Sequence, residues 1–334
     1  MQDLVKIRSG KPGSYPDQTV YAEYACAEFG LTFEDIDGGT GLTFGVASKA
    51  KRILFGAGRC SWYPQNNATA TTLASDKYFT NVILERAGIA TLGGDYFFLH
   101  DRHRARRAGG HEIEDALKYF ARLGATAFVK PLFGSRGDFA QAVYDEATLK
   151  SYILGASRYY DSILMQPLVS GDEYRVFLLD DDVLYAARKY PPVVLGDGMR
   201  SIRDLLNEHN AALQARGLSP TAGAAGDQAL DHVLPRGERW ELPGRMNLSA
   251  GGTMTLEAKP SVAVTAAARN AVRALGLRAA AVDLFTNIKG RAEVPAVIEV
   301  NSNPSIRQLE DSARTDLILK IWHHTFSAMG LLDV

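Results

Sequence analysis

Residues 297–310 read VIEVNSNPSIRQLE, and the fold assignment depends on this stretch. Apolar residues lead into Glu299, and the chain then passes through Asn301 to Pro304. The apolar start predicts a buried strand, which the proline ends because its nitrogen has no hydrogen to donate to a sheet. A buried strand that finishes in a carboxylate and a carboxamide places oxygen atoms where a core would have hydrocarbon. We therefore expect the strand to end at a functional site.

A second apolar strand that carries a carboxylate precedes this one. Asp283 lies within AVDLF, so Asp283 and Glu299 face one another if the two strands are neighbours. Two buried carboxylates repel unless a cation joins them, and Asn301 projects from the same face as Glu299. Oxygen ligands without His or Cys suit Mg²⁺. The alternative is an ordinary strand end followed by an Asn/Pro turn.

A lysine and a glycine-rich loop stand together in FVKPLFGSRGDF, residues 128–139. The pattern predicts a strand that delivers Lys130, followed by a loop from Gly134 to Gly137. Glycines let backbone N–H groups approach an oxyanion, and the lysine adds a positive charge. This combination is typical of a loop that covers phosphates. An ordinary hairpin loop with a surface lysine is the alternative.

Composition limits the class of protein. The 334 residues are 46% hydrophobic, which favours a folded core, and the net charge of −1 does not favour a general nucleic-acid binder. Cys26 and Cys60 lie far apart, which indicates neither a zinc site nor a disulfide framework. No apolar run reaches transmembrane length, so we expect a cytoplasmic protein without membrane contact. The basic run DRHRARR, 101–107, is expected to be solvated, with a phosphate or subunit contact as the alternative.

Helical and strand patterns alternate along the chain, and hairpins interrupt them. This favours an α+β fold with a split sheet. A hairpin is expected over 172–191, turning at 180–182. Helices are expected at 74–93, 113–124, 264–277 and 311–329, and Ser75 is expected to cap the first of them. Strands are expected at 52–58 and 162–169.

Taken together, these features resemble ATP-grasp enzymes. The resemblance spans about residues 75–310 and is sharpest toward the ATP-grasp domains of cyanophycin synthetases and of bifunctional glutathione synthetases. The matching stretches are GDEYRVFLL, YPPVVLGDGMRSIRDLL, MNLSAGGT and VIEVNSNPSIR. The resemblance implies two α+β subdomains that clasp ATP, after a small α/β domain. The expected bounds are 1–74 for the N-terminal domain, 75–165 for the lid subdomain and 166–334 for the subdomain with the metal site.

The resemblance also implies the residues that bind ATP. Two lysines hold the phosphates and a glycine loop covers them, while a hinge strand offers its backbone to adenine and an acid binds the ribose hydroxyls. In that order these residues are Lys77 and Lys130, then Gly134, Ser135 and Gly137, then Gln166, Leu168 and Val169, and finally Glu173.

Metal and reaction-centre residues follow from the same resemblance. Asp283, Glu299 and Asn301 are expected to bind two Mg²⁺, with Mn²⁺ as an alternative ion. Two arginines steady the transferred phosphoryl group or an acyl phosphate, an asparagine belongs to a loop that closes over the centre, and a further arginine holds a substrate carboxylate. These residues are Arg175 and Arg188, Asn247, and Arg307.

The implied activity is an ATP-dependent carboxylate–amine ligase that forms an amide bond through an acyl phosphate. Its partners would be a small-molecule carboxylate and an amine, and a homo-oligomer stays open. The alternatives are modification of a protein or ribosomal peptide, or an ATP-binding protein without catalysis. Ser305 and Asp138 depart from the family pattern, which carries a glycine after the proline and a small residue after the loop.

Overall fold

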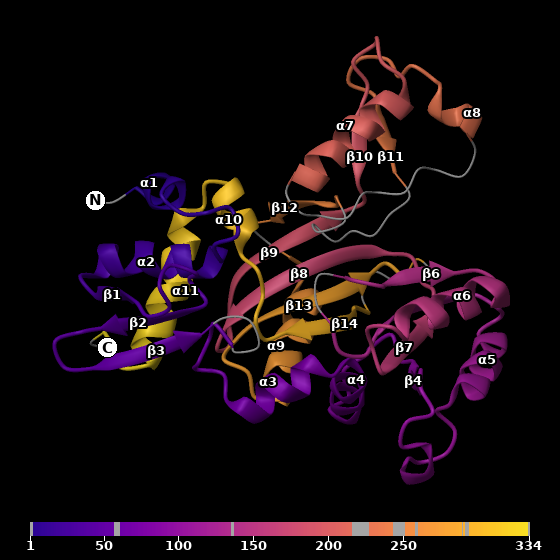
Figure 1. The fold of residues 1–334 in the computed structure, drawn as a ribbon, viewed down its shortest axis with the longest axis horizontal. Coiled ribbons are helices and arrows are strands. Elements are labelled where there is room, and N and C mark those ends of the chain that lie inside the picture. The colour runs from indigo at the N-terminus through magenta and orange to yellow at the C-terminus, as the bar shows by residue number, and fades with distance from the viewer. Residues whose placement is uncertain are drawn as a thin grey trace.

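A five-stranded antiparallel sheet forms the centre of the protein (Figure 1). The computed structural model describes residues 3–56, 61–134, 137–215, 227–242, 251–257, 260–288, 290 and 294–332. Within these residues the sheet has the strand order β12-β9-β8-β13-β14. Its strands are β8 (Asp172–Leu179), β9 (Asp182–Tyr190), β12 (Thr253–Glu257), β13 (Ala279–Thr286) and β14 (Ala296–Asn301). The expected hairpin over 172–191 is confirmed.

Three helices cover one face of this sheet: α3 (Ala68–Ser75), α4 (Lys77–Arg86) and α9 (Val262–Leu275). Alternate residues of β13, such as Val282 and Leu284, pack against them in one apolar core. The helix expected over 74–93 is confirmed as α4, but it ends at Arg86 and its cap is not Ser75. Ser75 ends α3, and Asp76 caps α4 by accepting hydrogen bonds from the backbone nitrogens of Tyr78 and Phe79.

On its other face the sheet packs against a block made from both ends of the described chain. The block has helices α1 (Leu4–Ser9), α2 (Asp17–Phe29), α10 (Arg307–Asp311) and α11 (Thr315–Ala328), and a sheet of β1 (Thr32–Asp35), β2 (Thr43–Ala47) and β3 (Arg52–Gly56). The fully buried Trp322 packs near Phe44 and Phe55. The helix expected over 311–329 is confirmed as α11, and the short helix α10 precedes it. No helix in the described part of the chain has the length and apolar character needed to cross a membrane.

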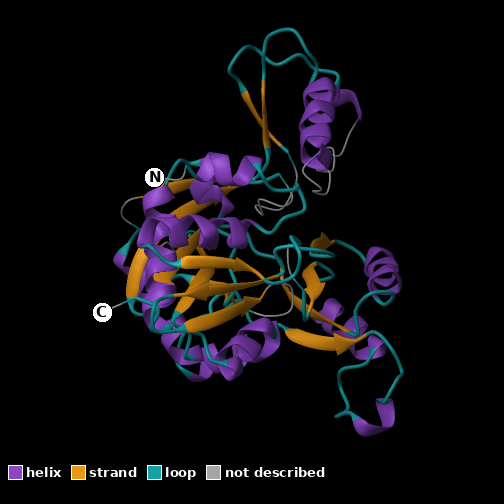
Figure 2. Cartoon of the chain, turned by 60° about the vertical axis from the view of Figure 1, so that its left-hand side comes forward, coloured by secondary structure: helices purple, strands orange, loops and turns teal. Residues whose placement is uncertain are grey.

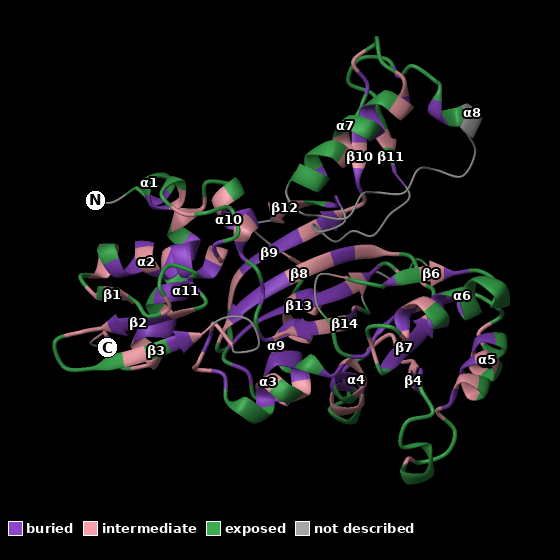
Figure 3. Cartoon of the chain, viewed as in Figure 1, coloured by how far each residue is buried: buried purple, intermediate pink, exposed green. Residues whose placement is uncertain are grey.

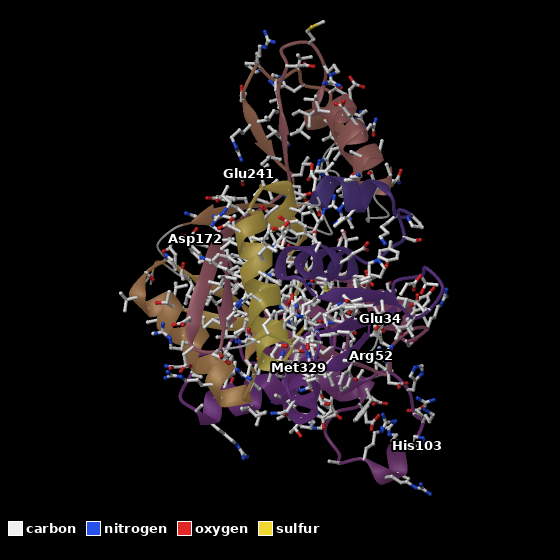
Figure 4. The ribbon with its side chains drawn as sticks, turned by 90° about the vertical axis from the view of Figure 1, so that its left-hand side faces the viewer. Glu34, Arg52, His103, Asp172, Glu241 and Met329 are labelled. Carbon is white, nitrogen blue, oxygen red and sulfur yellow. The ribbon has the colours of Figure 1, made fainter. Side chains whose placement is uncertain are left out.

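A four-stranded antiparallel sheet lies beside the central one, in the order β4-β7-β5-β6. Its elements are β4 (Asp95–Phe98), β5 (Ala127–Pro131), β6 (Gln141–Val143), β7 (Ser162–Pro167), α5 (Ile113–Arg122), α6 (Glu146–Ala156) and the 3₁₀ turn η1 (Arg104–Arg106). Val129 faces the apolar core that this sheet shares with α5 and α6, so Lys130 points to the opposite face. His103 stands at the end of a projecting loop (Figure 4).

A small module projects away from both sheets (Figure 2). It consists of a two-stranded ribbon, β10 (Val193–Leu195) and β11 (Arg239–Glu241), with α7 (Ile202–Ala215) and α8 (Asp227–Leu230). The module has its own apolar core, which includes the fully buried Ile202. Many of its residues are exposed, whereas β13 is almost entirely buried and β8 has no exposed residue (Figure 3).

Asn66 joins the N-terminal block to the central sheet. Its side chain donates to the carbonyls of Ala279 and Ser302 and accepts from the nitrogens of Arg278 and Ala279, over 2.8–3.1 Å. Only 6% of Asn66 is exposed. One carboxamide thus satisfies four backbone groups, which tie the start of β13 to the end of β14.

We expect Asn66→Ala to lower the free energy of unfolding by about 3 kcal/mol or more, because four buried backbone groups lose their partners. Denaturant unfolding followed by tryptophan fluorescence measures this change. Asn207→Ala, on an exposed position of α7, is the matched control and should change stability by less than about 0.5 kcal/mol. Equal effects of the two substitutions would contradict the structural role of Asn66.

Candidate active site

The candidate site lies on the face of the central sheet that also packs against the N-terminal block. Along β13, Ala279 and Ala281 belong to that apolar core, and Asp283 follows on the same face. Phe177 on β8 shares this face with Arg175 and pairs with Ala281. On this face of β8 and β13, apolar side chains are therefore followed along the strands by the charged side chains of Arg175 and Asp283.

The structure brings together the three residues expected to bind metal. Asp283 pairs with Glu299 in the antiparallel register of β13 and β14, and Asn301 pairs with Ala281. Asn301 Nδ2 donates to Glu299 Oε1 over 3.1 Å and lies 3.5 Å from Asp283 Oδ2. Asp283 is 2% exposed, whereas Glu299 and Asn301 are half-buried.

Arg175 holds Asp283 in a bidentate ion pair. The two residues pair across β8 and β13, and Nε and Nη2 of the guanidinium each donate to a different carboxylate oxygen over 2.7 Å. Burial disfavours the ionised form of Asp283, but Arg175 and Lys189 outweigh it and hold the pKa of this carboxyl well below its usual range. Asp283 is therefore ionised at every physiological pH.

Lys189 is the site residue that sequence reasoning misses. Its ammonium lies 2.5 Å from Glu173 Oε1 and 3.0 Å from Asp283 Oδ2, and the residue is only 3% exposed. Burial raises the pKa of Glu173 above its ordinary value, and Lys189 opposes this rise. Glu173, expected at the ribose hydroxyls, thus sits beside the metal-ligand candidates in a shared ionic network.

A β-bulge decides which cation of the hairpin reaches this network. The register of β8 and β9 shifts between Phe177 and Leu178, so that Glu173 pairs with Lys189 and Tyr174 pairs with Arg188. Neighbouring residues of a strand point to opposite faces, so Arg188 lies on the face away from Asp283. There it forms an ion pair with Asp172. If β8 and β9 paired without this bulge, the register would differ by one residue and Arg188 would pair with Glu173.

Two lysines approach the same acids from the second sheet and from α4. Lys77, the first residue of α4, donates from Nζ to the carbonyls of Leu132 and Gly134. Burial lowers the pKa of Lys77, and it lowers the pKa of Lys130 to about 8, while the charge of Glu299 opposes both shifts. Both lysines are therefore close enough to Glu299 for its charge to act on them.

The expected phosphate loop follows Lys130. Gly134 accepts the hydrogen bond from Lys77, and Gly137 has a φ of 70°, which glycine adopts without strain. Ser135 lies outside the described residues. The start of the loop is thus fixed against the first turn of α4.

The segment expected to be the hinge begins at the end of β7 and connects the two sheets. Gln166 is 1% exposed and donates from Nε2 to the carbonyl of Gly93 over 2.7 Å, and its Oε1 is a buried acceptor with no hydrogen bond from the described residues. Leu168 and Val169 follow β7 and lead into β8. This connecting segment thus begins with one buried acceptor that has no hydrogen bond from the described residues.

Two of the expected reaction-centre residues, Arg188 and Arg307, do not join this group. Arg307 lies on α10 and pairs with Asp17 over 3.1 Å and with Asp311 over 3.0 Å, at the contact between the N-terminal block and α10. Asn247 lies outside the described residues. The structure therefore brings Arg175, but not Arg307, to the acids of the central sheet.

The donor set fits an oxygen-bound divalent cation. Glu299 and Asn301 are half-buried, and neither forms an ion pair with an arginine or lysine among the described residues. Asn301 now points its Nδ2 at Glu299, and a rotation of its carboxamide by 180° would place Oδ1 there, beside the carboxylate of Glu299. Asp283 would have to share its oxygens with Arg175 and Lys189. Three carboxylates here meet four cations (Lys77, Lys130, Arg175 and Lys189), an excess that suits a polyanionic ligand.

No protein-family model matches the chain. It is 29% identical over 265 residues to cyanophycin synthetase of Trichormus variabilis, a match that covers 70% of this chain and 27% of that protein. It is 28% identical over 228 residues to the glutathione biosynthesis bifunctional protein GshAB of Streptococcus mutans, covering 58% and 29%. The chain thus spans less than a third of the length of these curated relatives.

A solved structure gives the fold independently. The bifunctional glutathione synthetase from Pasteurella multocida aligns with a TM-score of 0.56 at 18% identity, over 93% of this chain and 43% of that one. At this identity the likeness concerns the fold, and the fold matches the two-sheet arrangement described above. The chain therefore has the ATP-grasp fold, and its homologues are ATP-grasp ligases.

Proposed function

We propose that the protein is an ATP-dependent carboxylate–amine ligase that acts on amino acids or small peptides and releases ADP and phosphate. One observation carries the proposal: Asp283 and Glu299 pair on neighbouring strands, Asn301 donates to Glu299, and the buried ammonium of Lys189 lies 3.0 Å from Asp283. A site that assembles buried ammonium groups opposite paired carboxylates suits a phosphate chain bound together with a cation.

In this proposal the nucleotide lies in the gap between the sheets. Its phosphates take the ammonium groups of Lys77 and Lys130 and the backbone of the loop from Gly134 to Gly137. The adenine takes the hinge after β7, where Gln166 has an unused acceptor. The ribose hydroxyls compete with Lys189 for Glu173, which now accepts from that lysine.

Asp283, Glu299 and Asn301 would hold Mg²⁺, which when bound supplies positive charge that offsets the repulsion between phosphates and a substrate carboxylate. We propose two ions, as the resemblance implies. Arg175 is fixed by both oxygens of Asp283, so its remaining N–H groups keep a constant direction. That rigidity suits a guanidinium that stabilises charge developing on a transferred phosphoryl group.

The proposed reaction has two steps. A carboxylate oxygen of the first substrate attacks the γ-phosphorus of ATP, the bond to ADP breaks, and an acyl phosphate forms. The nitrogen of the amine then attacks the acyl carbon, loses a proton, and phosphate leaves with the electrons of the broken C–O bond. The chain's lysines and Arg175 neutralise the reacting anions, and closure of the four-stranded sheet would exclude water.

We expect Glu299→Gln to lower ADP release by about a hundredfold or more, because it removes the charge that pairs with the metal and keeps the size of the side chain. The measurement is ADP and phosphate release with amino acids and dipeptides, offered singly and in pairs. Glu241→Gln, on an exposed position of β11, is the matched control and should leave turnover unchanged. Wild-type turnover by Glu299→Gln would overturn the assignment of this site.

We expect the affinity for ATP to fall as the pH rises through about 8, the pKa to which burial lowers Lys130. Above this pH the free protein holds a neutral amine, so binding the phosphates requires proton uptake. The dissociation constant then rises by up to about tenfold per pH unit. Equilibrium binding of an ATP analogue that cannot be hydrolysed measures the dependence.

The matched variant for this prediction is Lys130→Arg, since a guanidinium stays charged throughout the range. It should bind the analogue with little dependence on pH between about 7 and 9.5. If the wild-type protein shows no fall in affinity over this range, the ammonium of Lys130 does not pair with phosphate.

A further inference from the structure

The strand that carries Glu299 and Asn301 lies at the edge of the central sheet. β14 pairs with β13, and the last pair of that ladder is at Asn301. On its outer side the described part of the chain offers it one isolated bridge, from Thr91 to Val297. Residues 302–304 then continue past the ladder toward α10 without a strand partner among the described residues. The direction of the strand end therefore depends on what holds residues 302–304.

Three residues from the N-terminal part of the chain hold this segment, each by one hydrogen bond to a different residue of it. Two of the bonds end on backbone carbonyls and one on a side-chain oxygen, over 2.9–3.1 Å. They run from Asn66 Nδ2 to the carbonyl of Ser302, from the backbone nitrogen of Trp62 to Oδ1 of Asn303, and from Gln18 Nε2 to the carbonyl of Pro304. Ser302 and Pro304 are buried, so a carbonyl left without its donor there would be costly.

Gln18 is the side chain among the three that holds the segment without also bonding to the sheet. Asn66 bonds to β13 as well, and Trp62 donates through its backbone. Gln18 lies in the first turn of α2, is 6% exposed, and donates from Nε2 both to Pro304 and to the hydroxyl of Tyr63, each over 3.0 Å. An amide nitrogen has two protons, so both are used and the orientation of the carboxamide is fixed.

The hydroxyl that accepts from Gln18 belongs to a ring in contact with the strand of Arg175. Tyr63 is fully buried and meets Phe177 of β8 edge-on, with the ring centroids 6.4 Å apart. Phe177 and Arg175 are alternate residues of β8 and share one face. Gln18 therefore joins the end of β14 to a ring packed against the strand whose arginine holds Asp283. Because a close-packed core resists small displacements, this connection is stiff.

We propose that Gln18 is a positioning residue for Glu299 and Asn301, because it fixes the direction in which β14 leaves the sheet. The inference rests on the proposed role of these two residues as metal ligands. No described hydrogen bond joins Gln18 to either of them, so it acts through Pro304. Ligand oxygens must stay within about 0.2 Å of their ideal distances from a cation, and a strand end that bends would weaken the site.

Hydrogen exchange of the full chain, followed by mass spectrometry, tests whether Gln18 holds the segment. Gln18→Met removes both protons of Nε2 and nearly keeps the size of the side chain. We expect the amides of residues 299–303 to exchange about tenfold faster in this variant, because the end of β14 opens more often. Unchanged exchange at 299–303 in a folded Gln18→Met variant would overturn the proposal.

Thr19→Val is the matched control for loss of a buried hydrogen bond from the same turn of α2. The hydroxyl of the fully buried Thr19 donates to the carbonyl of Gly41 over 2.7 Å, away from residues 302–304. The valine keeps the shape of the side chain and removes this donor. Exchange at 299–303 should stay within about twofold of the wild-type rate in this variant. Equal acceleration by both substitutions would reduce Gln18 to a general contributor to stability and overturn the proposal.

Mn²⁺ binding to the chain, read from the electron paramagnetic resonance signal of the free ion, tests the consequence for the ligands. Contacts that orient metal ligands commonly change metal affinity by about tenfold or more. We therefore expect Gln18→Met to weaken Mn²⁺ binding by about tenfold and Thr19→Val by less than about twofold. Asn303→Ala removes the acceptor of Trp62 at an exposed position, and it should weaken binding by about two- to fivefold.

Glu299→Gln separates a failure of this inference from a failure of the proposed function. If Glu299→Gln leaves the affinity for Mn²⁺ unchanged, the metal assignment is wrong, and hydrogen exchange still decides whether Gln18 fixes the end of β14. If Glu299→Gln weakens Mn²⁺ binding but Gln18→Met does not, the metal assignment stands and the positioning role of Gln18 is overturned.

Discussion

The charged site depends on the ion pairs that Asp283 forms with Arg175 and Lys189. The carboxylate of Asp283 is nearly inaccessible to solvent, and its ionisation is maintained because Arg175 grips both oxygens and Lys189 adds a third contact. A buried charge without these partners would be strongly destabilising. The order of the central sheet follows from the same requirement, since β13 must lie between the strands that deliver Arg175 and Glu299. The site and the sheet therefore depend on each other.

Much of this arrangement can be predicted from patterns within single segments. Alternating apolar residues and a proline identify β14, and a carboxylate inside each of two apolar strands predicts that Asp283 and Glu299 meet. The glycine loop after Lys130 follows from composition in the same way. These inferences succeed because each depends on the two-residue period of a strand or on the special conformations of glycine and proline.

What the sequence does not reveal depends on contacts between distant segments. Because of the bulge after Phe177, Lys189 rather than Arg188 faces the site, and no sequence pattern nearby predicts this bulge. The helix start near Asp76 is predicted to within one residue, but Ser75 and Asp76 are both good caps, and only the structure shows that Asp76 accepts from the first turn of α4. Asn66 resembles any polar residue of a connecting segment until β13 and the end of β14 are placed beside it. In each case the deciding contacts cannot be recognised from the periodic pattern of a single segment.

The shared core of the N-terminal block has a consequence for how the chain acquires its structure. Phe44 and Phe55 lie on strands made early in synthesis, but the indole that covers them belongs to Trp322 on α11. Contacts across so many residues form late, because a long loop must close before they contribute. Until α11 is synthesised, Phe44 and Phe55 lack the part of their cover that Trp322 supplies, although α2 already belongs to the same core. We therefore expect this block to complete its core only when both ends of the described chain are present.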